Sequence, residues 1–196
     1  MRSFGEIWNA VHEIPSAVGV YECEKLYDIA ADLAEDSLMV ELGCACGRST
    51  AVLGAVARDK NLRFITIDPF KTDYWQTENR QEAIDFFKKN MQLLDTKYEL
   101  LIDYSQNVAL DWWGHEFETE EKVDFLFIDG DHRYRGVRLD CELWIPFVKR
   151  GNYILFDDYS SSWEGVKKAV DEREDIEKIM EIENSILTRK IVGAKV

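Results

Sequence analysis

Short apolar runs alternate with helical patterns along most of this 196-residue chain, and this alternation restricts the fold more than any other feature. The runs are continuously apolar, which is typical of strands buried on both faces of a sheet. Strands that alternate with helices predict a parallel sheet with helices on both sides. The expected strands lie at 38–42, 64–67, 98–102, 123–128 and 153–156, and the expected helices between them at 48–58, 78–94, 106–113 and 136–148.

The N-terminal segment precedes this alternation and is predicted to be helical. Ser3 and Glu6 have the spacing of a capping box, and Pro15 ends the first helix. A second helical pattern covers 20–35. We expect these helices, within residues 1–36, to pack on or near the active site.

The C-terminal segment also departs from the alternation. A helix is expected near 163–173, followed by β-like runs at 176–182 and 186–192 that residues 183–185 separate, a pattern typical of an antiparallel hairpin. The acidic stretch 116–121 is interpreted as a solvated connection. We therefore predict one Rossmann-like α/β domain over 1–196, a parallel sheet with helices on both faces that an antiparallel hairpin closes.

Charge and composition exclude several classes of function. With 24 Lys and Arg against 38 Asp and Glu, the net charge of −14 disfavours nucleic acid and anionic lipid as partners. The apolar stretch at 51–57 is far shorter than the ~20 residues of a membrane span, and no apolar segment follows Met1 as a signal peptide requires. The expectation is a soluble, cytoplasmic protein. Its four cysteines, two of them in a tight turn at Cys44 and Cys46, do not have the pattern of a disulfide framework or of a complete zinc site.

The first candidate binding motif follows the first expected strand. Gly43 and Gly47 permit a sharp turn and a close approach of backbone to a ligand, and the helix after them offers free N–H groups to an anion. Glu41 places a carboxylate where a ligand ammonium group could lie. An ordinary strand-to-helix turn is the alternative. Asp68, at the tip of the second strand, suits a contact to ribose hydroxyls, with a helix cap or a surface acid as the alternative.

Three further carboxylates follow two strands that a single helix connects. Such strands usually lie side by side, so Asp129 and the pair Asp157 and Asp158 are expected at the same edge of the sheet. Three carboxylates there repel one another unless they share a cation, and oxygen ligands favour Mg²⁺, with Mn²⁺ or Ca²⁺ as alternatives. Helix capping by the same acids is the other interpretation.

Together these motifs resemble those of class I S-adenosylmethionine-dependent methyltransferases. Within that class the chain is similar to the metal-dependent O-methyltransferases, of both the catechol type and the macrocin type that methylates sugar hydroxyls. The resemblance covers about 38–159, extends by topology to the closing hairpin, and implies the seven-stranded methyltransferase fold. It implies cofactor contacts at Glu41, Gly43, Gly47, Ser49, Asp68, Ser105 and Gln106, and metal ligands at Asp129, Asp157 and Asp158.

One position departs from the catechol-type pattern. Those enzymes carry a catalytic lysine three residues past the first metal ligand, where this chain has His132. Histidine has an ordinary pKa of ~6.5, so His132 is a candidate general base. Asp129, the first of the metal ligands, is the other candidate catalytic residue. Lining of the pocket or contact with the cofactor is the alternative, and Asp131 is a candidate to orient the ring or to cap the next helix.

The function expected from the resemblance is metal-assisted methylation of a hydroxyl on a small molecule, with S-adenosylmethionine and Mg²⁺ or another divalent ion as cofactors. The alternatives are an NAD-type oxidoreductase and a non-catalytic protein that binds a nucleotide or S-adenosylmethionine, and a homo-oligomer is left open. Core packing is favoured for Trp112 and Trp144. Aromatic residues near the strand ends are candidates to stack on a phenol or a sugar, with core packing as the alternative: Phe70, Tyr74, Trp75, Tyr104, Trp112, Trp113, Tyr134, Tyr159 and Trp163.

Overall fold

The computed structural model describes residues 1–71, 77–115 and 122–191, without the side chains of 113–115. The expectations for Tyr74, Trp75, the side chain of Trp113, the acidic connection 116–121 and the last residue of the 186–192 run therefore lie outside the described residues.

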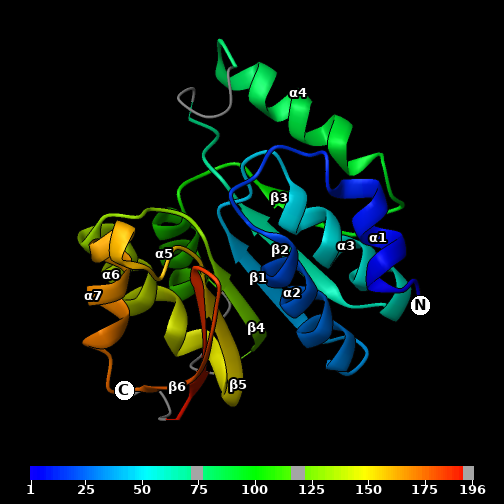
Figure 1. Ribbon diagram of the computed structural model, residues 1–196. Helices are drawn as coiled ribbons and strands as arrows, with labels where there is room; N and C mark the ends of the chain where they lie inside the picture. Colours follow the sequence, from blue (N-terminus) through cyan, green and yellow to red (C-terminus); the bar gives the residue numbers. More distant parts are fainter. Residues whose placement is uncertain (72–76, 116–121, 192–196) are drawn as a thin grey trace.

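A seven-stranded sheet forms the centre of the molecule, in the order β3-β2-β1-β4-β5-β7-β6 (Figure 1). The first five strands pair in parallel, and β7 pairs antiparallel with both β5 and β6. This confirms the predicted parallel sheet that a C-terminal hairpin closes. The strands are β1 (Leu38–Leu42), β2 (Arg63–Ile67), β3 (Glu99–Leu101), β4 (Val123–Ile128), β5 (Val148–Phe156), β6 (Ile176–Ile182) and β7 (Ser185–Lys190).

Helices cover both faces of the sheet. One group lies on the side of the N-terminal helices and the other on the opposite side (Figure 1). Among the described residues, no helix is both long and apolar enough to cross a membrane. The first group is α1 (Phe4–Val11), α2 (Val20–Asp32), α3 (Arg48–Lys60) and α4 (Arg80–Met91), and the second is α5 (Ser105–His115), α6 (Tyr134–Trp144) and α7 (Glu164–Asp171), with 3-10 turns at Ile145–Phe147 and Ser161–Trp163.

Strand β1 shows how the sheet divides the core in two. Successive side chains of a strand point to opposite faces. Leu38, Val40 and Leu42 pack into the cluster beneath α5, α6 and α7, whereas Met39 packs into the cluster beneath α1 to α4. Burial on both faces explains why the sequence of this strand is almost wholly apolar. The favoured core packing of Trp144 is confirmed, since it is fully buried with its ring centroid 5.0 Å from that of Trp112.

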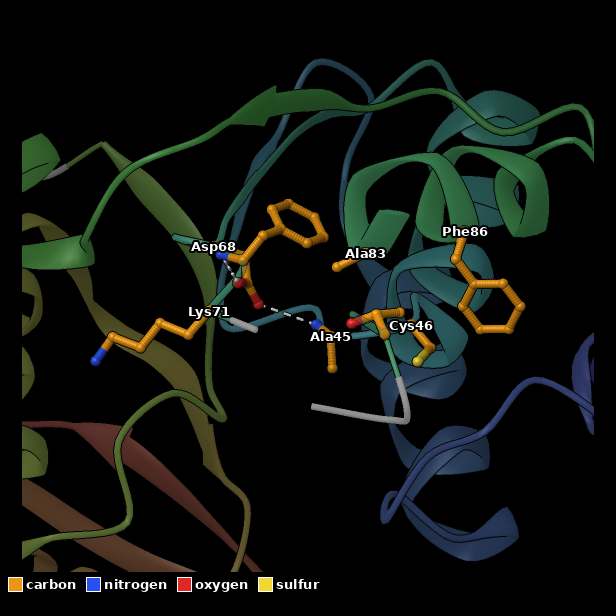
Figure 2. Close-up of a pocket in the computed structure, with 8 residues that line it drawn as sticks. Ala45, Cys46, Asp68, Lys71, Ala83 and Phe86 are labelled. Atoms are coloured by element: carbon orange, nitrogen blue, oxygen red, sulfur yellow. Dashed lines mark hydrogen bonds between the residues drawn. The ribbon is translucent and has the colours of Figure 1, made fainter. Parts of the chain in front are cut away.

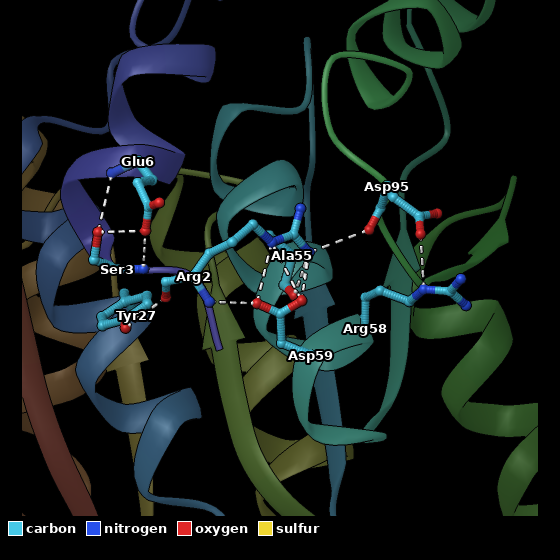
Figure 3. A network of polar contacts seen from close by, with 8 residues as sticks. All are labelled: Arg2, Ser3, Glu6, Tyr27, Ala55, Arg58, Asp59 and Asp95. Atoms are coloured by element: carbon cyan, nitrogen blue, oxygen red, sulfur yellow. Dashed lines mark hydrogen bonds and ion pairs between the residues drawn. The ribbon is translucent and has the colours of Figure 1, made fainter.

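Polar contacts fix the N-terminal helices to α3. The Arg2 guanidinium pairs with Asp59 at 2.8 Å, and the Tyr27 hydroxyl donates to the Arg2 carbonyl (Figure 3). The predicted capping box of Ser3 and Glu6 is present. Further along, Arg48 donates to the carbonyls of residues 12, 14 and 18. The link between α1 and α2 therefore lies beside the start of α3, next to the glycine turn.

Most element boundaries differ from prediction by a few residues, and two of these differences follow from the strand pairing. Strand β5 begins at Val148, five residues early, because Val148 pairs with Val123 while the polar residues between it and Tyr153 are mostly exposed. The hairpin turn consists of Glu183 and Asn184, because Ser185 already pairs with Ile182.

Candidate active site at the carboxyl edge of the sheet

The turn after β1 requires glycine at two positions. Gly43 has φ +89°, and a Cβ there would lie 2.1 Å from the carbonyl oxygen of Asp129. Gly47 has φ +93°, and a Cβ there would lie 2.5 Å from the Met91 side chain. Ala45, between them, also has a positive φ of +44°. The turn therefore fits tightly between the end of β4 and helix α4, and it leads into the N-terminus of α3.

Asp68 lies directly against this turn. One carboxylate oxygen accepts hydrogen bonds from the backbone N–H groups of Cys44 at 2.8 Å and Ala45 at 3.0 Å, and the other accepts from Phe70 N–H. Figure 2 shows the carboxylate beside a pocket that Ala45, Cys46 and Phe86 also line. The structure thus brings the two predicted cofactor elements, the turn and the acid of β2, into contact.

Glu41 is hydrogen-bonded to the start of α3, directly after this turn, and its contact with a ligand ammonium group stays a prediction. Its carboxylate is fully buried beneath α3 and accepts from the hydroxyls of Ser49 and Thr50 at 2.6 Å and of Thr66 at 2.7 Å. Burial raises the pKa of Glu41 to about 7. Glu41 thus joins β1 to α3 and β2, and the Ser49 hydroxyl is engaged with Glu41.

Ser105 and Gln106 are held by a residue that the sequence reasoning missed. Both side chains donate to one oxygen of Asp140, at 2.5 and 2.6 Å. Asp140 is almost completely buried on α6, which raises its pKa to about 6. A signal was present in the sequence, because Asp140 lies three residues after Val137 and four before Trp144, on the apolar face of its helix.

The acids after β4 and β5 converge as the connection predicted. Asp129 N–H donates to the Leu42 carbonyl and Asp157 N–H to the Ile128 carbonyl, so the parallel ladder continues into both residues. Ligand atoms of Asp129, Asp158 and His132 lie within 4.8 Å of one another. Burial and the carboxylates of Asp157 and Asp158 raise the pKa of Asp129 well above its ordinary value.

Asp157 adjoins this group from the buried side. Its negative charge acts on Asp129, and its Oδ1 accepts a hydrogen bond from the Ser185 hydroxyl at 2.7 Å. Burial and the neighbouring Glu22 raise the pKa of Asp157 to about 7. Asp158 takes a positive φ of +55°, which turns the chain so that its side chain lies toward His132.

The partner of His132 is Asp158, whereas Asp131 lies elsewhere. Nε2 of His132 is 2.6 Å from the Asp158 carboxylate, and this bond raises the pKa of the imidazole. Asp131 instead accepts from the backbone and guanidinium of Arg133, so it does not orient the ring. Trp163 also contacts the imidazole of His132, and the two rings stack with their centroids 4.5 Å apart.

Comparison with known proteins agrees with this geometry. A family model described as a methyltransferase domain matches residues 40–159, which is more than half of the chain and spans the strand ends described above. The chain belongs to this methyltransferase family.

Individual relatives are more distant. Over 127 residues, the methyltransferase is 30% identical to an uncharacterised protein of Acanthamoeba polyphaga mimivirus, covering 64% of this chain and 52% of that protein, so it spans about half of that relative's length. The solved O-methyltransferase NovP superposes with a TM-score of 0.68 at 18% identity, covering 90% of this chain and 82% of that one. An O-methyltransferase from Bacillus cereus in complex with SAH superposes with a TM-score of 0.60 at 15% identity, covering 95% and 90%. At these identities the solved structures show the shared fold.

The candidate site thus has two parts at one sheet edge. The first is a glycine turn held by Asp68, with the free N–H groups of α3 beside it, an arrangement suited to a ligand that carries both hydroxyls and an anionic group. The second is a group of three carboxylates, a donor set suited to a hard divalent cation, with the imidazole of His132 beside it.

Proposed function

We propose that this methyltransferase transfers a methyl group from S-adenosylmethionine to a hydroxyl of a small molecule, of sugar, phenol or diol type, with the help of Mg²⁺ or another divalent ion. The observation that carries the proposal is the convergence of Asp129, Asp157, Asp158 and His132 at the same sheet edge as the glycine turn and Asp68. Methyl donor and acceptor would then meet between the ends of β1 and β4, which are neighbouring strands.

The cofactor would lie across the turn of Gly43 and Gly47. Its ribose hydroxyls would be held by Asp68, whose carboxylate is already fixed by three backbone N–H groups. The N-terminus of α3 would hold its carboxylate through free N–H groups, Ser49 among them. Ser105 and Gln106, fixed by Asp140, would border the adenine.

The three aspartates fit a divalent ion. Asp129 and Asp158 have oxygens within reach of a common ion, Asp157 adjoins Asp129, and the raised pKa of Asp129 reflects negative charge that this group holds close together. Bound to an acceptor oxygen, a divalent ion lowers the pKa of that hydroxyl. The role of the three aspartates would be to hold the divalent ion at the ends of β4 and β5.

His132 would take the proton from the acceptor hydroxyl at its imidazole. Trp163 holds the ring by stacking, and Asp158 holds Nε2, so the ring is oriented before an acceptor binds. In-line alignment of the acceptor oxygen with the methyl group would supply much of the remaining acceleration.

The test is a paired binding and transfer assay. Isothermal titration is expected to show S-adenosylhomocysteine binding and no comparable binding of NAD. Methyl transfer from S-adenosylmethionine to a panel of sugars, diols and phenols is expected to require Mg²⁺. Binding without transfer to any acceptor would favour a non-catalytic binding protein, and transfer that is equal without metal would reject the metal-assisted mechanism.

A further inference from the structure

Glu22 and Ser185 meet in the interior although 163 residues separate them in the sequence. Glu22 lies in the first turn of α2, and Ser185 is the first residue of β7. The Ser185 hydroxyl oxygen lies 2.9 Å from Oε1 of Glu22, and both side chains are at most 2% exposed. A buried carboxylate is costly unless it is hydrogen-bonded, so this contact strongly restrains both elements.

Two backbone contacts extend the same junction. The Glu22 carboxylate accepts from Gly19 N–H at 2.6 Å and from Asn184 N–H at 3.2 Å. A Cβ on Gly19 would lie 2.5 Å from the carboxylate of Glu183. The start of α2 is therefore pressed against the turn between β6 and β7.

The junction also reaches the candidate metal site. The same Ser185 hydroxyl donates its proton to Oδ1 of Asp157, the nearer acceptor at 2.7 Å, and the negative charge of Asp157 acts on Asp129. We propose that Ser185 and Glu22 are positioning residues, which orient Asp157 as a metal ligand and thereby make helix α2 and the C-terminal hairpin parts of the metal site. This inference rests on the proposed function, since it requires that Asp157 ligates the ion.

The physical reason is the freedom of an aspartate side chain. A carboxylate with one oxygen fixed by a neighbour presents the other in one direction, so less ordering is required when the ion binds. Partners that orient the ligands of a metal typically change metal affinity by 10–100-fold when they are removed. Neither Ser185 nor Glu22 is expected to touch the ion.

Strand β7 supplies a matched control for this role. Thr188 lies three residues after Ser185, is fully buried, and donates its hydroxyl to the Ile154 carbonyl of β5 at 3.1 Å. Both hydroxyls therefore tie β7 to the chain of β5 or its end, but only the Ser185 contact is with a proposed metal ligand. A purely structural effect would appear in both variants.

The experiment measures MnCl₂ binding to the full chain by calorimetry, for the unmodified protein, Ser185→Ala and Thr188→Val. Ser185→Ala is expected to weaken Mn²⁺ binding by about 10–100-fold and to leave S-adenosylhomocysteine affinity within about twofold. Thr188→Val is expected to lower the melting temperature while both affinities stay within about twofold. An Mn²⁺ affinity in Ser185→Ala equal to that of the unmodified protein would overturn the positioning role. Failure of the unmodified protein to bind Mn²⁺ would overturn the metal site itself, and the positioning role with it.

A second pair of variants covers the case in which Ser185→Ala does not fold. Glu22→Ala removes the acceptor of the Asn184 N–H, which places Ser185 beside Asp157, and is expected to weaken Mn²⁺ binding at least tenfold. Glu22→Gln keeps an oxygen acceptor of the same reach and is expected to restore the affinity to within about threefold. Equal Mn²⁺ affinity in Glu22→Ala and in the unmodified protein would overturn the proposal.

Discussion

Carboxylates lie at two places along one edge of the sheet, and different groups compensate their negative charge at each place. Asp68, at the end of β2, accepts three hydrogen bonds from backbone N–H groups, which are fixed donors of the fold. Asp129, Asp157 and Asp158, at the ends of β4 and β5, lie against one another, with a hydroxyl and an imidazole as partners. The first carboxylate is satisfied by the fold, whereas the second group needs a proton or a cation.

This difference separates a binding role from a chemical role. A carboxylate that fixed amides hold can accept further hydrogen bonds from a ligand without a change in its own charge. A group of facing carboxylates changes its protonation, its metal occupancy or both when a ligand binds. Each of the following experiments tests one side of the comparison.

Chelation is expected to have the largest effect. If the three aspartates hold the ion, excess EDTA should abolish methyl transfer while the affinity for S-adenosylhomocysteine, which depends on Asp68 and the turn, stays within about twofold. Added Mg²⁺ should raise the melting temperature, because a ligand at 100 times its Kd stabilises the folded state by about 2.7 kcal/mol. Full methyl transfer in excess EDTA would contradict a metal-dependent role for the three aspartates.

Substitution of His132 is expected to reduce kcat at least a hundredfold, since general-base assistance is worth ~10²–10⁴-fold. His132→Ala should keep its affinity for Mg²⁺ and for S-adenosylhomocysteine, and His132→Lys should recover part of the rate at higher pH, where lysine loses its proton. His12 is exposed at the end of α1 and supplies the control, because His12→Ala should leave kcat unchanged. If the kcat of His132→Ala stays within threefold of that of the unmodified protein, His132 is not the general base.

Glu41 is a further buried carboxylate, and hydroxyl groups rather than backbone amides donate hydrogen bonds to it. Its pKa rises to about 7 in the folded protein because it is fully buried. A raised folded pKa means stability that is present below the unfolded pKa near 4.5 and lost as pH rises through about 7. Glu41→Gln should therefore gain stability relative to the unmodified protein by an amount that grows to about 3 kcal/mol between pH 5 and pH 8. Urea unfolding at both pH values measures it, and an offset that does not change with pH would contradict the assignment.

The sequence predicted the positions of these carboxylates but not their partners. Strands β1 and β4 were predicted with their observed ends, because continuous apolar runs bounded by Gly43 and Asp129 leave little freedom in placing them. Parallel pairing then required the strand-end acids to meet at one edge. That part of the site follows from local patterns and a topological rule.

The partners depend on contacts between distant segments. Whether Glu41 faces a ligand or α3 depends on which face of β1 it occupies, and strand alternation with Val40 and Leu42 could have indicated the α3 side. The contact of Ser185 with Glu22 has no local signal, because it depends on how α2 packs against the hairpin. Asp140 is intermediate, since its helical periodicity predicts burial without showing that Ser105 and Gln106 are its donors.

The smallest expected effect concerns Asp68 and separates two roles that this residue combines. Loss of a charge-assisted hydrogen bond costs ~1.5–3 kcal/mol, so Asp68→Ala should weaken S-adenosylhomocysteine binding about tenfold or more. Because Asp68 also holds the N–H groups of Cys44 and Ala45, the same loss would follow if it merely shapes the turn. The 2′,3′-dideoxy analogue of S-adenosylhomocysteine distinguishes these cases as a double-mutant cycle would. If Asp68 binds the ribose, removal of the hydroxyls weakens binding to the unmodified protein much more than to Asp68→Ala. If the substitution weakens both ligands equally, Asp68 acts on the turn alone, and the ribose contact must be sought elsewhere at this edge.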